Sequence, residues 1–255
     1  MNRLFLFFAL LVTIAALAIS GQVAVGKRVD STWKPKSKYF DARQLLRDVE
    51  HLASDELEGR SADLPSMLKA RDYVEKRFKE PGLTPIGNSY KQEFQITERG
   101  SDKKITGVNF VGQIKGKKKS DKYIVITAHY DHVGISKGEI YNGADDNASG
   151  TAALFAIAKY FVKKKPDHSL IFVAFDAEEQ GLQGARHFVA NLPIAKESIV
   201  VNVNMDMLSR SDKNELYAAG TTHYSQFRNV FEKVKKIVFD IETKNIFQDV
   251  GSNNP

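Results

Sequence analysis

The chain has 255 residues, of which 42% are hydrophobic and 27% are charged. This balance is typical of a globular protein and excludes a chain that is mainly disordered. The net charge of +6 is modest, and the dense basic run Lys115–Lys122 lies between two apolar segments. That placement predicts a solvated hairpin turn, so we expect no nucleic-acid partner. The chain has no cysteine, so any metal must be held by His, Asp and Glu.

Residues 1–20 have the layout of a secretory signal peptide. Arg3 precedes an apolar run from Leu4 to Ile19, and small residues follow it. The run is short for a membrane span. We therefore expect an exported protein, periplasmic or extracellular, with no stable membrane association beyond this segment; an uncleaved N-terminal anchor is the alternative. Residues 21–40 show no clear period and are predicted to form a lead-in segment.

Residues 41–255 are predicted to form a single domain, in which a helical wrap of residues 41–100 precedes a core of residues 101–255. Asp41 is placed to cap a first helix, and a second helix is expected from about Ser66. Apolar residues recur at helical spacing in both segments: Leu45, Leu46, Val49 and Leu52 in the first, and Ala70, Val74 and Phe78 in the second.

Strands and helices alternate in the rest of the chain. Strand patterns occupy residues 107–116, 123–132, 169–181 and 198–210, and helix patterns occupy residues 147–166 and 182–193. An edge strand at 214–220 and an amphipathic helix at 224–238 follow. This alternation predicts an α/β fold with a mostly parallel central sheet flanked by helices on both faces.

Acidic residues and histidines follow each central strand of this prediction. They are His129, Asp131 and His132, then Asp176, Glu178 and Glu179, then Asp206, with the pair Asp145-Asp146 in a loop between. Ligands of open α/β sheets bind beyond the carboxyl ends of the strands. Carboxylates that meet there would repel one another unless a cation joined them, and carboxylate with imidazole suits zinc.

The spacing within these motifs fits a metal site. His129 and Asp131 are two apart, so on a strand they share a face, and Asp131 could hold the imidazole in the tautomer that a metal needs. Glu178 and Glu179 are adjacent, so their carboxylates point in different directions. One can bind metal while the other acts as general base.

The motifs "HYDH", "GADDNASG", "DAEEQGLQGA" and "NMDM" resemble, in order, those of the co-catalytic zinc aminopeptidase family. That family includes secreted bacterial leucyl-type aminopeptidases, and its relatives include glutamate carboxypeptidases and glutaminyl cyclases. The resemblance implies a zinc exopeptidase fold, a metallo-aminopeptidase activity, two zinc ions and peptide substrates. We expect a monomer.

The resemblance also implies a role for each matching residue. His129 and Asp206 would bind the first zinc, Asp145 would bridge both ions, and Glu179 would bind the second. Glu178 would be the general base, and Asp131 the partner of His129. The family's non-proline cis bond would fall at Asp145-Asp146. His132 is interpreted as a surface or packing residue.

One family ligand has no counterpart in this sequence. The family has a histidine in a Ser-Asp-His motif, and Ser252-Asn253-Asn254 stands near its expected place. The closing strand and helix of the family are also absent, so the chain is a fragment or a degenerate member. His223 is a weak candidate replacement, because no orienting acid lies near it. With only Asp145 and Glu179 at the second position, we expect one zinc to be held better than two, and weak or no hydrolysis. The alternatives are a glutaminyl cyclase-like enzyme and a non-catalytic peptide-binding domain.

Overall fold

The computed structural model describes residues 37, 39–97, 102–118, 121–210, 218–221 and 224–238. The predictions for the signal peptide at 1–20, for most of the lead-in segment, for His223 and for Ser252–Asn254 lie outside the described residues. In the described part, no helix has the length and apolar character needed to cross a membrane.

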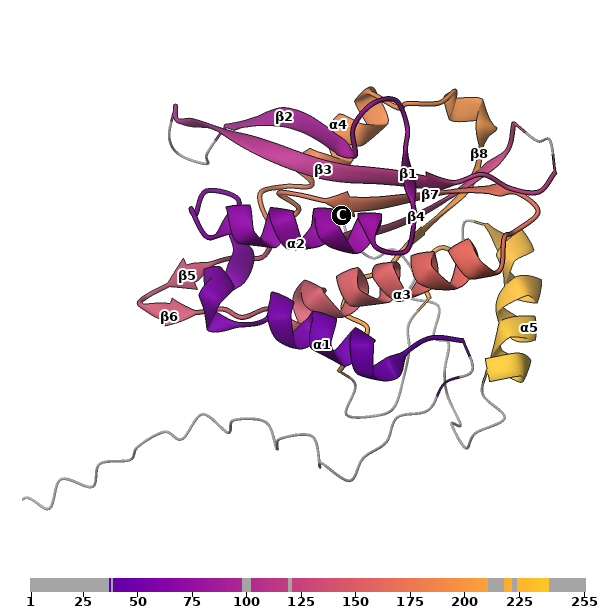
Figure 1. The fold of residues 1–255 in the computed structure, drawn as a ribbon, viewed down its shortest axis with the longest axis horizontal. Coiled ribbons are helices and arrows are strands. Elements are labelled where there is room, and N and C mark those ends of the chain that lie inside the picture. The colour runs from indigo at the N-terminus through magenta and orange to yellow at the C-terminus, as the bar shows by residue number, and fades with distance from the viewer. Residues whose placement is uncertain are drawn as a thin grey trace, which may run out of the picture. The chain divides into compact units, whose positions relative to one another are not determined.

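The core of the fold is a six-stranded mixed sheet (Figure 1). Its strands are β1 (Thr84–Pro85), β2 (Lys91–Thr97), β3 (Lys104–Ile114), β4 (Tyr123–His129), β7 (Ser169–Phe175) and β8 (Ile199–Asn204). The order is β1-β3-β7-β4-β8, with β2 also paired to β3. β7, β4 and β8 run parallel, whereas β3 is antiparallel to β1, β2 and β7. The predicted α/β class is confirmed, and the parallel strands form one side of the sheet.

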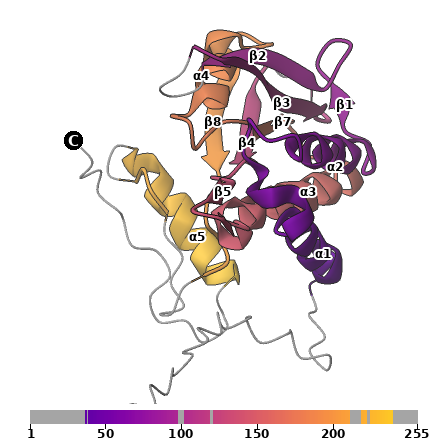
Figure 2. The same ribbon diagram turned by 90° about the vertical axis from the view of Figure 1, so that its left-hand side faces the viewer.

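Helices cover both faces of the sheet, as predicted. α1 (Ala42–Leu52), α2 (Met67–Lys79) and α3 (Gly150–Lys163) lie on one face, and α4 (Gln183–Ala190) lies on the other (Figures 1 and 2). Alternation along β7 explains this arrangement, because successive side chains of a strand point to opposite faces. Phe172 packs in the cluster with α1–α3, and Val173 packs in the cluster with Phe188 of α4. All seven residues of β7 are buried, as expected of a central strand.

The segment before the core differs in part from the sequence prediction. The Asp41 cap is confirmed, since its carboxylate accepts a hydrogen bond from the backbone N–H of Gln44 at 3.1 Å. However, residues 41–100 are not only helical, because β2 forms there and pairs with β3. The run Lys115–Lys122 is not a hairpin turn either, because β7 lies between β3 and β4.

The connection from β4 to α3 is the irregular part of the fold that matters for function. It contains the short strands β5 (Ile135–Ser136) and β6 (Glu139–Ile140), then the kinked turn η2 (Ala144–Ser149), in which Asp146 and Asn147 are not helical and which leads directly into α3. A 3-10 turn, η1 (Asp55–Arg60), lies between α1 and α2. The remaining elements are η3 (Lys196–Ser198), η4 (Ser225–Phe227) and α5 (Arg228–Val238).

Candidate metal centre

Polar side chains from three parallel strands meet at one edge of the sheet. His129 is the last residue of β4, Glu179 follows β7, and Asp206 follows β8. Asp146 reaches the same place from η2. Because β7, β4 and β8 are parallel neighbours, their carboxyl ends lie side by side, which is why residues so far apart in the sequence converge.

His129, Asp146 and Asp206 form a first group of ligand atoms. The Nε2 atom of His129 lies 3.3 Å from Oδ1 of Asp146 and 3.4 Å from Oδ1 of Asp206. Two ligands that are each 2.0–2.1 Å from a tetrahedral zinc ion are about 3.3 Å apart. The two separations from His129 therefore match the spacing of ligands around tetrahedral zinc.

The electrostatics of His129 point to the same conclusion. Its Nδ1 atom lies 3.2 Å from the backbone carbonyl of Asp131 and 3.5 Å from the carboxylate of that residue. Its Nε2 atom faces two further carboxylates and must carry either a proton or a cation. Burial alone would lower the pKa of His129, but the carboxylates of Asp131 and Asp206 outweigh burial and raise the pKa to about 10. Without a metal, a proton takes the place of the cation.

A second group consists of His132, Asp146 and Glu179. The Nδ1 atom of His132 lies 2.7 Å from Oε1 of Glu179 and 3.9 Å from Oδ2 of Asp146. These two separations bracket the spacing expected around tetrahedral zinc, so the donor types suit the ion but the fit is poorer than in the first group. The hydrogen bond with His132 lowers the pKa of Glu179 and keeps it ionised.

The shared carboxylate is Asp146, which corrects the prediction for Asp145. Asp146 offers Oδ1 to the first group and Oδ2 to the second. Asp145 belongs to neither group, because its Oδ1 atom accepts hydrogen bonds from the backbone N–H and the hydroxyl of Ser209, both at 2.8 Å. The cis peptide bond lies at Asp146-Asn147 and not at the predicted Asp145-Asp146.

Asn147 explains which of the two aspartates turns inward. Its buried side chain donates to the carbonyl of Met205 at 3.0 Å and accepts from the N–H groups of Gly150 and Met207. The bond to Gly150 also caps the start of α3. η2 is thereby fixed to the segment that follows β8, and this fixes the direction of the residue just before Asn147.

Asp131 connects the histidine motif to the glutamate pair. Both of its carboxylate oxygens accept hydrogen bonds, one from the backbone N–H of Glu178 at 3.0 Å and one from that of Glu179 at 3.3 Å. Burial raises the pKa of Glu178, and the charge of His129 opposes this shift. Among the described residues, the Glu178 carboxylate makes no hydrogen bond or ion pair, so it remains available to accept a proton.

Asp176, which shares its strand end with the glutamate pair, points away from them. Its buried carboxylate accepts from Arg71, from the N–H of Val108 and from the hydroxyl of Tyr130. It ties β3, β7 and α2 together and belongs to neither group of ligand atoms. We assign it a structural role.

Sequence reasoning missed two residues of the centre, His132 and Asp146, and one neighbour, Arg60. His132 ends the predicted strand pattern 123–132, but β4 ends at His129, so strand periodicity could not place its ring. Asp146 could have been identified from its position next to Asn147, because the side chain of Asn147 anchors the turn.

The sequence of the chain is similar to those of known peptidases. The model of peptidase family M28 matches residues 109–254. Over 143 residues, the chain is 36% identical to an aminopeptidase, YwaD, of Bacillus subtilis strain 168, a match that covers 53% of this chain and 30% of that protein. The chain thus spans about a third of the length of this curated relative.

Solved structures share the fold. A Zn-dependent exopeptidase from Parabacteroides distasonis aligns with a TM-score of 0.67 and 18% identity, over 84% of this chain and 78% of that one. A glutaminyl cyclase from Porphyromonas gingivalis aligns with a TM-score of 0.69 and 16% identity, over 84% and 76% of the two chains. At these identities the likeness concerns the fold.

Proposed function

This chain belongs to peptidase family M28, and on that premise we propose that it is a zinc-dependent exopeptidase of the aminopeptidase type. One observation carries the proposal: a single carboxylate, Asp146, stands between two histidines, each of which has a second acid at hydrogen-bonding or ion-pair distance. The Bacillus aminopeptidase supports the choice of reaction.

We assign His129, Asp146 and Asp206 to a first zinc, and His132, Asp146 and Glu179 to a second. Zinc, when bound, supplies Lewis-acid chemistry, polarising the scissile carbonyl and making a water molecule more acidic. The first group matches the tetrahedral spacing better, so we expect the first ion to be held more tightly than the second. All five proposed ligands lie between His129 and Asp206.

Glu178 is the proposed general base. Its carboxylate is half-buried and lies beside both groups, and the bond from its own N–H to Asp131 fixes the backbone that carries it. It would accept a proton from the attacking water and then deliver that proton to the leaving amine. Asp131 does not touch the substrate; it positions His129 and Glu178 together.

We further propose that the protein is exported and acts on peptides as a monomer. The layout of residues 1–20 supports export, and the family supports peptide substrates. The chain has no cysteine, so its metal ligands would be carboxylates and imidazoles, and it forms no disulfide bond.

The test compares metal-free and zinc-loaded protein on three peptides. One has a free N-terminal leucine, the second has the same sequence with an acetylated N-terminus, and the third begins with glutamine. Because His132 would supply the histidine that the sequence motif lacks, we expect release of leucine from the first peptide only, and only with zinc, in place of the weak or absent hydrolysis expected from the sequence alone. Hydrolysis that persists in chelator, or equal cleavage of the acetylated peptide, would contradict the proposal. Cyclisation of the third peptide without hydrolysis of the first would favour a glutaminyl cyclase-like enzyme, and peptide binding without chemistry would favour a binding domain.

A further inference from the structure

Arg60, in the turn between α1 and α2, is a fully buried cation bound by backbone carbonyls. It is 0% exposed. Its Nε atom donates to the carbonyl of Tyr130 at 2.8 Å, Nη1 donates to the carbonyls of Asn142 (2.8 Å) and Leu52, and Nη2 donates to the carbonyl of Gly143 at 2.9 Å. One guanidinium thus joins the end of α1, the end of β4 and the start of η2.

Two of these three segments carry the proposed metal ligands. Tyr130 lies between His129 and Asp131, and Asn142-Gly143 leads into Asp146. The backbone of the turn adds a bond in the opposite direction, because the carbonyl of Arg60 accepts from the N–H of His132 at 3.2 Å. Arg60 is therefore bonded to the chain beside three of the five proposed ligands while touching none of their side chains.

The charge of Arg60 is not neutralised by direct contact. Among the described residues, no carboxylate lies within ion-pair distance of its guanidinium. Burial lowers the pKa of Arg60 to about 10, while the more distant carboxylates of Asp131, Asp146 and Glu179 raise it. The group therefore stays protonated at neutral pH. A buried cation is costly unless other charges and dipoles compensate it, and here the acids of the metal centre do so across the loop.

Glycines make this close packing possible. A Cβ atom on Gly143, whose φ is +61°, would lie 2.7 Å from Nη2 of Arg60 and 2.3 Å from the carbonyl oxygen of Asp146. A Cβ atom on Gly59, the residue before Arg60, would lie 2.4 Å from the carbonyl oxygen of Tyr141. Only glycine fits at either position without moving the backbone. These close contacts therefore fix the position of the Arg60 guanidinium relative to the loop that carries Asp146.

We propose that Arg60 is a positioning residue that orients the metal ligands by fixing the backbone on both sides of them. This inference rests on the metal centre proposed above. Lysine keeps the charge but cannot reach four carbonyls from one plane, because its ammonium is a compact group with three donors. Substitution should thus weaken metal binding even though every ligand remains present.

The experiment titrates metal-free wild type and the Arg60→Lys variant with Co²⁺ and records visible absorption, which reports affinity and coordination geometry. We expect Arg60→Lys to bind about 10–100-fold more weakly, the loss typical when the partners of metal ligands are removed, with an altered spectrum. Equal affinity and an identical spectrum would overturn the proposal, whatever the change in melting temperature.

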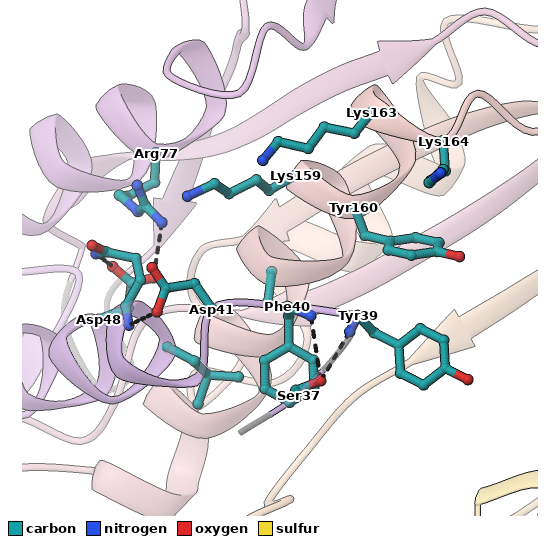
Figure 3. Close-up of a pocket in the computed structure, with 13 residues that line it drawn as sticks. Ser37, Tyr39, Phe40, Asp41, Asp48, Arg77, Lys159, Tyr160, Lys163 and Lys164 are labelled. Carbon is teal, nitrogen blue, oxygen red and sulfur yellow. Dashed lines mark hydrogen bonds and ion pairs between the residues drawn. The ribbon is translucent and has the colours of Figure 1, made fainter. Parts of the chain in front are cut away.

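Arg77→Lys is the matched control. Arg77 is also a buried arginine, 7% exposed, but it contacts Asp48 at 3.0 Å and Glu80. It lines a pocket with Lys159 and Lys163 (Figure 3), whereas the metal centre adjoins the start of α3. This variant should lose thermal stability and keep the wild-type Co²⁺ affinity and spectrum. A loss of affinity equal to that of Arg60→Lys would show that general destabilisation is the cause.

A measurement on the wild type decides the question if Arg60→Lys does not fold. Coupling is reciprocal, so a residue that orients the ligands must itself be stabilised when metal binds. Zn²⁺ should slow hydrogen exchange of the Arg60 Nε–H more than that of the Arg77 Nε–H. Equal slowing would refute the inference. If the wild type binds no metal at all, the proposed function fails as well; if it binds metal and Arg60→Lys binds equally, only this inference fails.

Discussion

Asp131 accepts a hydrogen bond from the backbone N–H of Glu178 at 3.0 Å, and this bond joins the residue that follows β4 to the proposed general base after β7. The same carboxylate lies 3.5 Å from Nδ1 of His129. One side chain therefore contacts both a proposed metal ligand and the backbone of the proposed base. The neighbours of the Asp131 carboxylate are the N–H groups of Glu178 and Glu179 and the ring of His129. Its function therefore depends on having two acceptor oxygens.

Asp131→Asn should disturb both partners. The amide keeps one acceptor oxygen but directs an NH₂ group at a donor, so either His129 or the 178–179 backbone loses its bond. We expect metal affinity to fall about 10–100-fold and hydrolysis to fall at least as much. Isothermal titration with Zn²⁺ measures the first effect and steady-state kinetics the second. An unchanged affinity would show that the bonds to Asp131 do not orient the ligands.

Glu178→Gln should separate chemistry from metal binding. Glutamine cannot accept the proton of the attacking water, and general-base catalysis contributes about 10²–10⁴-fold. We expect kcat to fall by that factor while Zn²⁺ affinity stays close to the wild-type value, because Glu178 belongs to neither ligand group. Glu197→Gln, an exposed residue of η3, is the control and should leave both quantities unchanged. Full activity in Glu178→Gln would remove this residue from the mechanism.

The pair Asp145→Asn and Asp146→Asn tests which aspartate is shared. Asp146 faces both histidines, so its loss should weaken both metal positions by more than the roughly 10–100-fold typical of indirect partners. Asp145 bonds to Ser209, so Asn at this position should affect metal affinity little. Stoichiometry and affinity from metal analysis after dialysis distinguish the two. The opposite ranking would restore the assignment of Asp145 as the bridge.

Asp41→Ala should destabilise the fold in a pH-dependent way. Loss of an N-cap costs about 1 kcal/mol of unfolding free energy. The hydrogen bond from the Gln44 N–H lowers the pKa of Asp41 below its ordinary value of 3.8. The stabilisation is therefore present above pH 3.8 and is lost as pH falls through the lower pKa of the folded state. Urea unfolding of the wild type and variant at pH 7 and below pH 3 should show the difference shrinking. Asp41→Asn keeps a capping oxygen and should show no such dependence.

The sequence predicted the sheet edge at which the centre forms, because runs of β-branched residues followed by acids mark the strands that end there. β4 and β7 are buried as expected, whereas β8 is largely exposed, with Val200 and Val203 facing solvent. β4, β7 and β8 are the strands that carried this signal. The antiparallel half of the sheet was harder to predict from the sequence. β2 has no long apolar run, and its pairing with β3 depends on packing across the sheet.

The sequence pattern could not predict the directions in which individual side chains point. Asp145 and Asp146 have the same chemistry and adjacent positions, and the choice between them depends on Asn147, whose partners lie in the segment after β8. His132 follows Asp131 immediately, yet its ring turns to Glu179 because the backbone leaves the strand there. Contacts between segments distant in the sequence determine both side-chain directions, and the local spacing of residues does not predict such contacts.

The strand order has a consequence for when the proposed metal ligands can come together. β4 lies between β7 and β8, both of which are synthesised after it. The contact of Thr127 with Asn204 closes across 77 positions of sequence. A growing chain that has made β4 and η2 holds His129 and Asp146 but not yet Asp206. Because Asp206 joins His129 and Asp146 only after this loop closes, the complete first group can form only once β8 has paired with β4.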